Sequence, residues 1–572
     1  MDYTIKIGGE AGQGIQTVGD ALSHIFARAG YYVFTHQDYE SRIRGGHNFY
    51  QIRISDKPVT ASRIKVDIIV ALDKQSIIEH EKELSQQGHV LYDSTFLKEK
   101  YDKPHFLDVP LFELAQTHGG SKIMANTVAV GAVIGMLGMN PEIMYEIVRK
   151  TFKKKAEEVI DANLKSAKAG YEYARKQCLT CSFMVSGFSS PKLLITGNEA
   201  IGFGAIASGL KFYSAYPMTP STGIFNFVAE NARDFGIVVE QAEDEIAAVN
   251  MAIGASFAGV RTMTGTSGGG FALMVEGISL AGMTETPLVI ALAQRPGPAT
   301  GLPTRTEQAD LLFALFAGHG EFPKVIFAPG NPEEAVYLTN KAFELSEKYQ
   351  ITAIILTDQY LADSQWSYEG FNLTKLKYND YRLRGDAFRR LKYYARHSFT
   401  ETGVSPLGVP GDSSHLVVTD SDEHDEEGHI IEDADTRVRM VEKRLLRKIP
   451  LIKKEIEPPL IYGEISPHIV LLCWGSMYGI VKEVVDELSE KYKIAMVHFS
   501  EIYPLPQEMG WLETLKNAKL CINIEQNSTG QFAKLLRMET GFSPHQQINR
   551  FDGRAFTVDE LKEKVYGYIG RL

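Results

Sequence analysis

The chain has 572 residues, of which 44% are hydrophobic and 23% charged. This length and composition indicate a globular protein of about three or four domains and exclude a single small module or a disordered chain. Sixty basic and 71 acidic residues give a net charge of −11, which argues against a broad surface for nucleic acid or for an anionic membrane. Because the N-terminus lacks the basic and apolar regions of a signal peptide and no apolar stretch approaches the roughly 20 residues of a membrane span, we expect a cytoplasmic protein.

Residues 1–185 have the pattern of an α/β domain. A strand over residues 3–7 leads through a glycine-rich turn, which contains Gly12 and Gly14, into a helix over residues 15–29 with apolar residues at helical spacing. Cys178 and Cys181 lie at the end of this domain, and without a second cysteine pair we interpret them as free thiols rather than as a redox pair or half a metal site. Further elements are expected as strands at 66–72 and 90–92 and as a helix at 126–137.

Two further α/β domains follow, separated by a connector of different composition. Residues 191–372 alternate predicted strands with helices, so a doubly wound and mostly parallel sheet is the simplest topology. Residues 373–459 form the connector, whose acidic block at 420–435 contains nine carboxylates and neither Lys nor Arg. Residues 460–572 predict a third α/β domain. The expected strands are 212–215, 237–239, 261–264, 287–293 and 351–357 in the middle domain, and 469–473, 494–499 and 520–524 in the last.

Residues able to carry chemistry follow the strands of the middle domain. The carboxyl ends of parallel strands meet at one edge of a sheet, where ligands bind. A carboxylate begins one helix, three consecutive glycines leave the backbone open to close approach by a ligand, and two arginines follow the strand at 287–293. We therefore expect one site at this edge. Its candidate residues are Tyr216, Pro217, Thr219, Glu245, Gly268, Gly269, Arg295 and Arg305.

The motifs in these positions resemble those of a known enzyme family. Residues 216–222, Tyr-Pro-Met-Thr-Pro-Ser-Thr, are similar to a signature of the α subunit of 2-oxoacid:ferredoxin oxidoreductases, in which Ile usually stands in place of Met218. That exchange is apolar and should leave the loop intact. The first domain resembles the separate γ subunit of the family, here fused ahead of the α subunit. The other matching motifs are at 239–245, 264–270, 301–304 and 525–531, and at 9–15 and 41–46 in the first domain.

The resemblance implies a thiamine diphosphate enzyme. Glu245 matches the family position whose carboxylate hydrogen-bonds N1′ of the aminopyrimidine ring and so promotes loss of the C2 proton. The implied reaction is the oxidative decarboxylation of 2-oxoglutarate with coenzyme A to succinyl-CoA, CO2 and reduced ferredoxin. The residues that match cofactor-binding motifs are Tyr216, Pro217, Glu245, Gly268 and Gly269.

The resemblance also implies how the substrate is held. A 2-oxoacid needs a cation for its carboxylate and a hydroxyl near its carbonyl, which Arg295, Arg305 and Thr219 can supply. Arg295 matches the family position closest to the C1 carboxylate. Arg305 is a candidate for the distal carboxylate of a dicarboxylic acid, although it could equally assist at C1.

Parts of this chemistry are missing from the chain. Thiamine enzymes hold the diphosphate through Mg²⁺ with a Gly-Asp-Gly motif, which occurs nowhere here. An iron-sulfur cluster needs four cysteine ligands, whereas the four cysteines of this chain lie in distant domains. The resemblance therefore implies a β subunit that carries Mg²⁺ and [4Fe-4S] clusters in an (αβ)₂ heterotetramer, with ferredoxin as electron acceptor. We expect no metal site in this chain.

Several alternatives stay open. The turn with Gly12 and Gly14, together with Arg44, fits a coenzyme A or phosphate site, an interface, or simply tight packing. The acidic stretch with His424 and His429 fits a solvated loop, a cation site, or a mobile loop near the active site. Pyruvate, or a broad, branched or aromatic range of 2-oxoacids, is the alternative substrate. A non-catalytic dinucleotide-binding or electron-transfer module is the alternative of another class, and the missing nicotinamide fingerprint argues against it.

Overall fold

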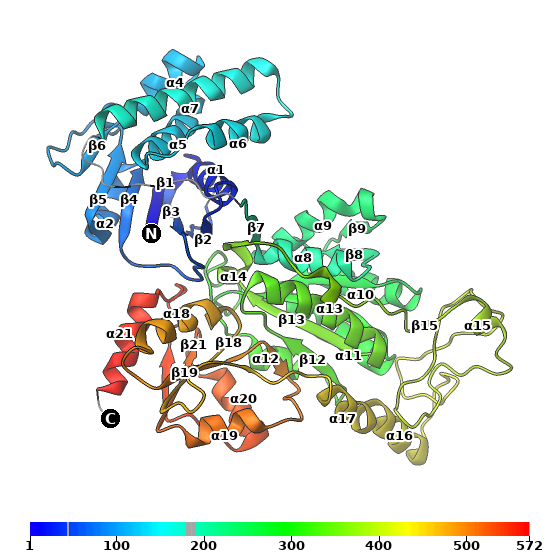
Figure 1. Ribbon diagram of the computed structural model, residues 1–572. Helices are drawn as coiled ribbons and strands as arrows, with labels where there is room; N and C mark the ends of the chain where they lie inside the picture. Colours follow the sequence, from blue (N-terminus) through cyan, green and yellow to red (C-terminus); the bar gives the residue numbers. More distant parts are fainter. Residues whose placement is uncertain (43–44, 179–182, 184, 186–189, 571–572) are drawn as a thin grey trace. The chain divides into compact units, whose positions relative to one another are not determined.

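The computed structural model describes residues 1–42, 45–178, 183, 185 and 190–570. The chain forms two compact units, shown in Figure 1. Unit 1 consists of residues 1–195, 364–371 and 557–572, and unit 2 of residues 196–363 and 372–556. The expected α/β class is confirmed in both units, whereas the finer division into four segments stays a prediction. No helix in the described part of the chain combines the length and the apolar character that a membrane crossing needs.

Unit 1 is built on one eight-stranded sheet with the order β6-β5-β4-β1-β3-β2-β14-β7. Strands β1, β4, β5 and β6 are parallel, whereas β3, β2 and β14 continue the sheet in antiparallel pairings. The strands are β1 (Asp2–Ala11), β2 (Tyr32–Asp38), β3 (Gly45–Ser55), β4 (Val66–Ala71), β5 (Leu84–Tyr92), β6 (Phe106–Asp108), β7 (Leu193–Thr196) and β14 (Gln365–Tyr368).

The helices of unit 1 pack closely on the sheet and on one another. Between α5 and α7 the backbones approach so closely that a Cβ on Gly131 would lie 2.0 Å from the carbonyl oxygen of Ala167, and only glycine fits there. Cys178, just after α7, is disulfide-bonded, so the prediction of a free thiol is wrong, while Cys181 lies outside the described residues. The helices are α1 (Ile15–Arg28), α2 (Lys74–His80), α3 (Ser94–Leu97), α4 (Leu111–Gly119), α5 (Ala125–Met136), α6 (Glu142–Phe152), α7 (Glu157–Gln177) and α21 (Val558–Ile569).

Unit 2 contains a seven-stranded sheet with the order β20-β12-β13-β11-β10-β8-β9, in which every pairing except β12 with β20 is parallel. All five predicted strands of the middle domain are present. The strands are β8 (Phe212–Ala215), β9 (Val238–Gln241), β10 (Thr262–Thr266), β11 (Leu288–Gln294), β12 (Lys324–Phe327), β13 (Thr352–Asp358) and β20 (Glu501–Tyr503). The helices are α8 (Gly197–Ala207), α9 (Thr222–Phe235), α10 (Glu245–Phe257), α11 (Gly268–Met283), α12 (Leu311–Phe316), α13 (Pro332–Tyr349) and α14 (Gln359–Asp363).

A second sheet of unit 2 has the order β17-β19-β18-β21-β22 and shares one hydrophobic core with the first. Ile290 and Leu292 of β11 belong to the same buried cluster as Trp474 and Val497. The two sheets of unit 2 therefore belong to one packed body. The elements are β17 (Leu460–Gly463), β18 (Ile469–Trp474), β19 (Ile494–Phe499), β21 (Leu520–Glu525) and β22 (Gln546–Asn549), with α18 (Tyr478–Leu488), α19 (Gly510–Asn517) and α20 (Gln531–Thr540).

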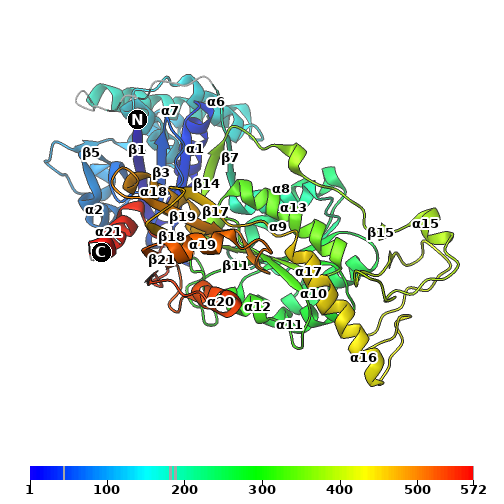
Figure 2. The same cartoon turned by 60° about the horizontal axis from the view of Figure 1, so that its bottom comes forward.

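The connector has little regular structure before residue 434 and then becomes helical. Figure 2 shows α16 (Ala434–Val441) running on into α17 (Lys448–Lys453) through a π-helical turn. Much of the acidic block is exposed, as expected for a solvated loop, but His424 within it is fully buried and Glu423 pairs with Arg437 and Arg444. Basic residues outside the block thus neutralise part of it. The short elements before it are β15 (Arg382–Leu383), α15 (Gly385–Arg389) and β16 (Leu407–Gly408).

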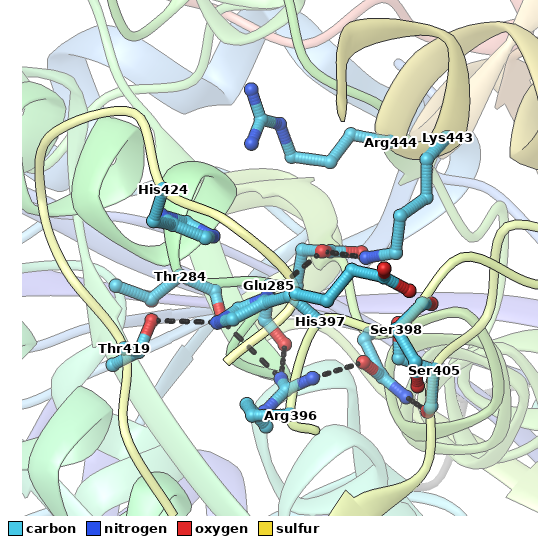
Figure 3. A network of polar contacts seen from close by, with 12 residues as sticks. Thr284, Glu285, Arg396, His397, Ser398, Ser405, Thr419, His424, Lys443 and Arg444 are labelled. Carbon is cyan, nitrogen blue, oxygen red and sulfur yellow. Dashed lines mark hydrogen bonds and ion pairs between the residues drawn. The ribbon is translucent and has the colours of Figure 1, made fainter. Parts of the chain in front are cut away.

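A buried ionic network around Glu285 fastens the connector to the end of α11 (Figure 3). The carboxylate of Glu285 pairs with the ammonium groups of Lys443 and Lys448, and its Oε1 lies 3.2 Å from Nδ1 of His397. Arg396 donates to the backbone oxygen of Glu285 at 2.7 Å. Although burial acts to raise it, the charges of the two lysines hold the pKa of Glu285 well below its usual range. The network therefore joins a buried anion to two cations from the connector helices.

Candidate active site

Arg295 links the loops that follow β8 and β11 at the carboxyl edge of the seven-stranded sheet. Its Nη1 donates a hydrogen bond to the backbone oxygen of Thr219 at 2.8 Å. Its Nε is buried and has no hydrogen-bond partner within the described residues. Burial lowers the pKa of Arg295, and the charges of Asp310 and Glu245 act in the opposite direction. Arg295 is therefore a cation with one unsatisfied donor, near enough to two carboxylates for their charges to act on it.

Glu245 is the first residue of α10 and lies at the same edge. Its side chain is only 3% exposed, and Oγ1 of Thr266 donates to its Oε1 at 3.4 Å. A Cβ on Gly270 would lie 2.2 Å from this Oε1. Only a glycine at position 270 therefore leaves space for the carboxylate of Glu245. The neighbouring carboxylates Glu240 and Glu243 are exposed. The structure thus distinguishes Glu245 from the other acidic residues of its motif.

Asp310 and Glu307 belong to the same site and were missed from the sequence. Oδ2 of Asp310 is buried without a partner among the described residues, and a Cβ on Gly268 would lie 2.5 Å from it. Burial raises the pKa of Asp310 to about 6, against the lowering effect of Arg295. Burial and the charge of Asp310 raise the pKa of Glu307 to about 7. The only signal in the sequence was that both carboxylates follow Arg305 in the loop after β11.

The other predicted residues of this site have different surroundings. Tyr216 is 40% exposed. Gly269 has open space around its Cα, since a Cβ added there would have only the carbonyl oxygen of Ala299 within 4 Å, at 3.8 Å. Arg305 is buried, and its stem packs at Gly553, where an added Cβ would lie 3.1 Å from the Cβ of Arg305. Pro217 lies between Tyr216 and Thr219 on the loop after β8.

The glycine-rich turn of unit 1 lines a separate cavity of about 280 Å³. Gly12 and Gly14 have φ angles of +93° and +85°, which strongly favour glycine. At the cavity the rings of Phe96 and Phe112 stack with centroids 4.3 Å apart. Arg44 lies outside the described residues. The other lining residues include Gln13, Asp93, Lys122 and Asn126.

Comparisons with known proteins agree with this arrangement. Residues 203–443 match the family model "Pyruvate flavodoxin/ferredoxin oxidoreductase, thiamine diP-bdg", and residues 4–173 match "Pyruvate ferredoxin/flavodoxin oxidoreductase". The 2-oxoacid:ferredoxin oxidoreductase subunit alpha of a Sulfolobus species is 32% identical over 100% of this chain and 97% of its own length. The chain belongs to the 2-oxoacid:ferredoxin oxidoreductase α subunits. The resemblance seen in the sequence is thereby confirmed.

Two further relatives of this α subunit carry more specific names. The 2-oxoglutarate oxidoreductase subunit KorA of Mycobacterium tuberculosis is 27% identical over 100% of this chain and 92% of its own. A solved structure of 2-oxoglutarate:ferredoxin oxidoreductase from Magnetococcus marinus, with 2-oxoglutarate, coenzyme A and succinyl-CoA bound, has a TM-score of 0.90 at 29% identity and covers 99% of both chains. The α subunit described here is therefore a component of an oxidoreductase.

The site of this α subunit fits the pyrimidine half of thiamine diphosphate. A buried carboxylate with a single weak hydrogen bond can accept a bond from a ring N–H. The backbone at Gly268–Gly270 forms a cradle that side chains would fill, since a Cβ at Gly268 or Gly270 would collide with Asp310 or Glu245. Oγ of Ser267, just before this cradle, is also buried and without a hydrogen-bond partner in the described part of the chain. Within the same described residues no cluster of His, Cys, Asp and Glu could hold a metal.

Proposed function

We propose that this α subunit, joined to a β subunit, oxidatively decarboxylates 2-oxoglutarate with coenzyme A to give succinyl-CoA, CO2 and reduced ferredoxin. The observation that carries the proposal is that the buried carboxylate of Glu245 and Arg295, whose Nε is buried without a hydrogen-bond partner among the described residues, lie at one sheet edge near enough for their charges to interact. The names of the KorA relative and of the Magnetococcus marinus enzyme support 2-oxoglutarate as the substrate.

Each candidate residue of the site has a defined task in this proposal. Thiamine diphosphate, when bound, supplies the carbon nucleophile that attacks the 2-oxo group and allows CO2 to leave. Glu245 holds the aminopyrimidine ring by a hydrogen bond at N1′ and thereby sets the protonation of that ring. Arg295 binds the C1 carboxylate, for which its unsatisfied Nε is a donor, while Thr219 offers a hydroxyl near the carbonyl. Tyr216, Pro217, Gly268 and Gly269 complete the wall around the cofactor.

A β subunit would supply the parts that this chain lacks. We place the Mg²⁺ and diphosphate site and the [4Fe-4S] clusters there, in an (αβ)₂ heterotetramer that reduces ferredoxin. The surface beside Glu245 supports such a partner, because α10 and α11 expose the large apolar side chains Ile246, Met251 and Leu273. Exposed large apolar side chains on neighbouring helices are typical of protein interfaces when they form one patch.

Coenzyme A requires a second binding region, for which we propose the cavity of unit 1. Gly12 leaves the backbone open to a phosphate, since a Cβ added there would have nothing within 4 Å, whereas Gly14 packs against Asn126. Lys122 adds a cation at the same cavity. The stacked pair of Phe96 and Phe112 offers an apolar face for an adenine ring. Arg44 stays a candidate for the same region.

The function is tested by anaerobic reduction of a viologen dye. The complex purified with its partner should reduce the dye with 2-oxoglutarate only when coenzyme A is present. The chain alone should show no 2-oxoacid-dependent reduction and should contain no iron. Turnover by the lone chain would contradict the assignment as a subunit, and a complex without 2-oxoacid-dependent turnover would favour the non-catalytic alternative.

Substrate choice is tested by replacing Arg305 with alanine in the complex. If Arg305 holds the distal carboxylate, its loss removes a charge-assisted hydrogen bond of about 1.5 to 3 kcal/mol, which lowers kcat/KM for 2-oxoglutarate roughly 10-fold to 150-fold. Pyruvate has a methyl group at that end and should be almost unaffected. Equal damage to both acids would instead assign Arg305 to C1 or to the structure of the loop. Arg295→Ala is the matched control and should impair both substrates.

A further inference from the structure

The loop after β11 contains a carboxyl group for which the proposed reaction has no use. We propose that Asp310 is a positioning residue that adjusts the charge around Arg295, taking up a proton when the carboxylate of a 2-oxoacid binds there. The inference rests on the proposed function, because it concerns the same substrate site.

The position of Asp310 is fixed by its backbone. Its N–H donates to Oε1 of Gln294 at 2.9 Å, and Gln294 directly precedes Arg295. Its carbonyl oxygen accepts from the N–H of Ala314 at 2.8 Å and so begins α12. The carboxyl group packs against the Cα of Gly268, at the first turn of α11. Asp310 thus connects the loop of Arg295 to the glycine cradle.

Within the described residues, no hydrogen bond explains why Oδ2 of the half-buried Asp310 is itself buried. It makes no capping hydrogen bond to α12, although it stands in the N-cap position, and its Oδ2 is buried without a partner among the described residues. An unsatisfied buried carboxyl oxygen destabilises a fold unless another interaction compensates. The interaction that the site offers is electrostatic, with the charge of Arg295.

The balance of charge explains the expected proton uptake. The charged groups around Asp310 are Arg295 and Glu307, and Arg295 also interacts with Glu245. One cation therefore faces two carboxyl groups before any substrate enters, and Glu307 adds a third carboxyl group beside Asp310. A substrate carboxylate adds another negative charge beside Arg295, and a nearby like charge favours the neutral form of a carboxyl group. The charge of Asp310 acts on Arg295 more strongly than the charge of Glu245 does, so Asp310 is the group on which the proton settles.

The protonation equilibrium of Asp310 sets the pH range of the effect. Burial raises the pKa of Asp310 to about 6 when no substrate is bound, so its carboxyl group is largely ionised at pH 7 to 8. When the substrate binds, Asp310 has to take up a proton from the solvent. This proton uptake becomes less favourable as the pH rises, and substrate binding weakens with it. Affinity for the 2-oxoacid should therefore fall above pH 6, whereas a side chain that is always neutral should show no such loss.

The experiment measures KM and kcat of the αβ complex for a 2-oxoacid between pH 6 and 8. In the wild-type complex KM should rise roughly tenfold over this range. In Asp310→Asn, which mimics the protonated carboxyl, KM should stay within about twofold, and kcat should follow the same pH dependence as in the wild type. Glu307→Gln is the matched control from the same loop and should keep the wild-type slope of KM.

Two outcomes would overturn the inference and leave the proposed function intact. One is a wild-type complex that turns over 2-oxoacids with a KM independent of pH. This measurement requires only the wild-type complex. The other is an Asp310→Asn complex that keeps the wild-type rise of KM. If the slope is lost in Glu307→Gln and retained in Asp310→Asn, the proton belongs to Glu307. A wild-type complex without any 2-oxoacid turnover contradicts the proposed function itself.

Discussion

Replacement of Glu245 by glutamine is expected to slow the turnover of 2-oxoacids by the αβ complex by about 10² to 10⁴-fold. Glutamine keeps the size and polarity of the side chain but has no negative charge with which to accept the proton-linked hydrogen bond at N1′. The buried position at the start of α10 should tolerate the change, because Asp244 caps the helix through the N–H of Ala247 at 2.7 Å. The rate is measured as anaerobic dye reduction with saturating 2-oxoacid and coenzyme A.

The control for this variant is Glu243→Gln, two residues earlier. Glu243 is exposed and lies outside the cradle, so its loss should leave the rate within about twofold, as expected for an exposed residue with no part in the chemistry. Equal thermal stability of both variants would separate the loss of activity from a loss of folding. Near-full turnover in Glu245→Gln would move the role to another carboxylate, and Asp310 would be the next to examine.

Loss of the carboxylate in Glu285→Gln should destabilise unit 2 strongly. The ammonium groups of Lys443 and Lys448 would be left buried without an anion, and breaking a buried pair by removing one partner costs about 3 to 5 kcal/mol. Equilibrium unfolding of the chain in urea, followed by tryptophan fluorescence, measures the change. The exposed pair of Asp386 with Arg389 provides the control, since Asp386→Asn should change stability by less than about 1 kcal/mol.

A double variant separates charge from packing at Glu285. Adding Lys443→Met to Glu285→Gln removes one of the two unpaired cations and keeps an unbranched side chain of similar length. Part of the lost stability should return, because an apolar group in this buried position carries no desolvation penalty. Unchanged stability in Glu285→Gln alone would show that the two lysines find other partners or lose their protons at little cost. Burial lowers the pKa of Lys443 to about 8. Loss of protons from the lysines in Glu285→Gln can therefore be measured as a dependence of the unfolding free energy on pH.

The regular parts of the fold were predictable, because their signals are local. Strands such as β11 and β13 are continuous apolar runs in a parallel sheet, and such runs are visible in the sequence. Strand β3 was missed for the opposite reason. It buries Gln51 and Arg53, and Arg53 is neutralised by Asp2 at 2.6 Å. A pattern that scores polar residues as exposed cannot find a strand in which the partner of Gln51 is Arg63 and the partner of Arg53 lies 51 positions away at Asp2.

The same distinction applies to the site and to the connector. Glu245 and Arg295 lie in motifs that directly follow strands, so their shared position followed from the topology alone. The burial of Asp310 depends on Gly268, which is 42 positions earlier in the sequence, and the acidic block is partly neutralised by helices that come after it. Whether a charged residue is exposed depends on partners that a local pattern does not contain.

The discontinuous makeup of unit 1 has a consequence for biosynthesis. Strand β14 pairs with β2 through Trp366 and Phe34, and α21 comes from the extreme end of the chain. A ribosome that adds about 5 to 20 residues per second needs roughly 20 to 75 seconds to proceed from the end of the N-terminal segment to α21. During the first part of this interval β2 has no outer neighbour, and an open strand edge invites pairing with other chains. The nascent N-terminal domain therefore has to be protected from aggregation until the later segments arrive.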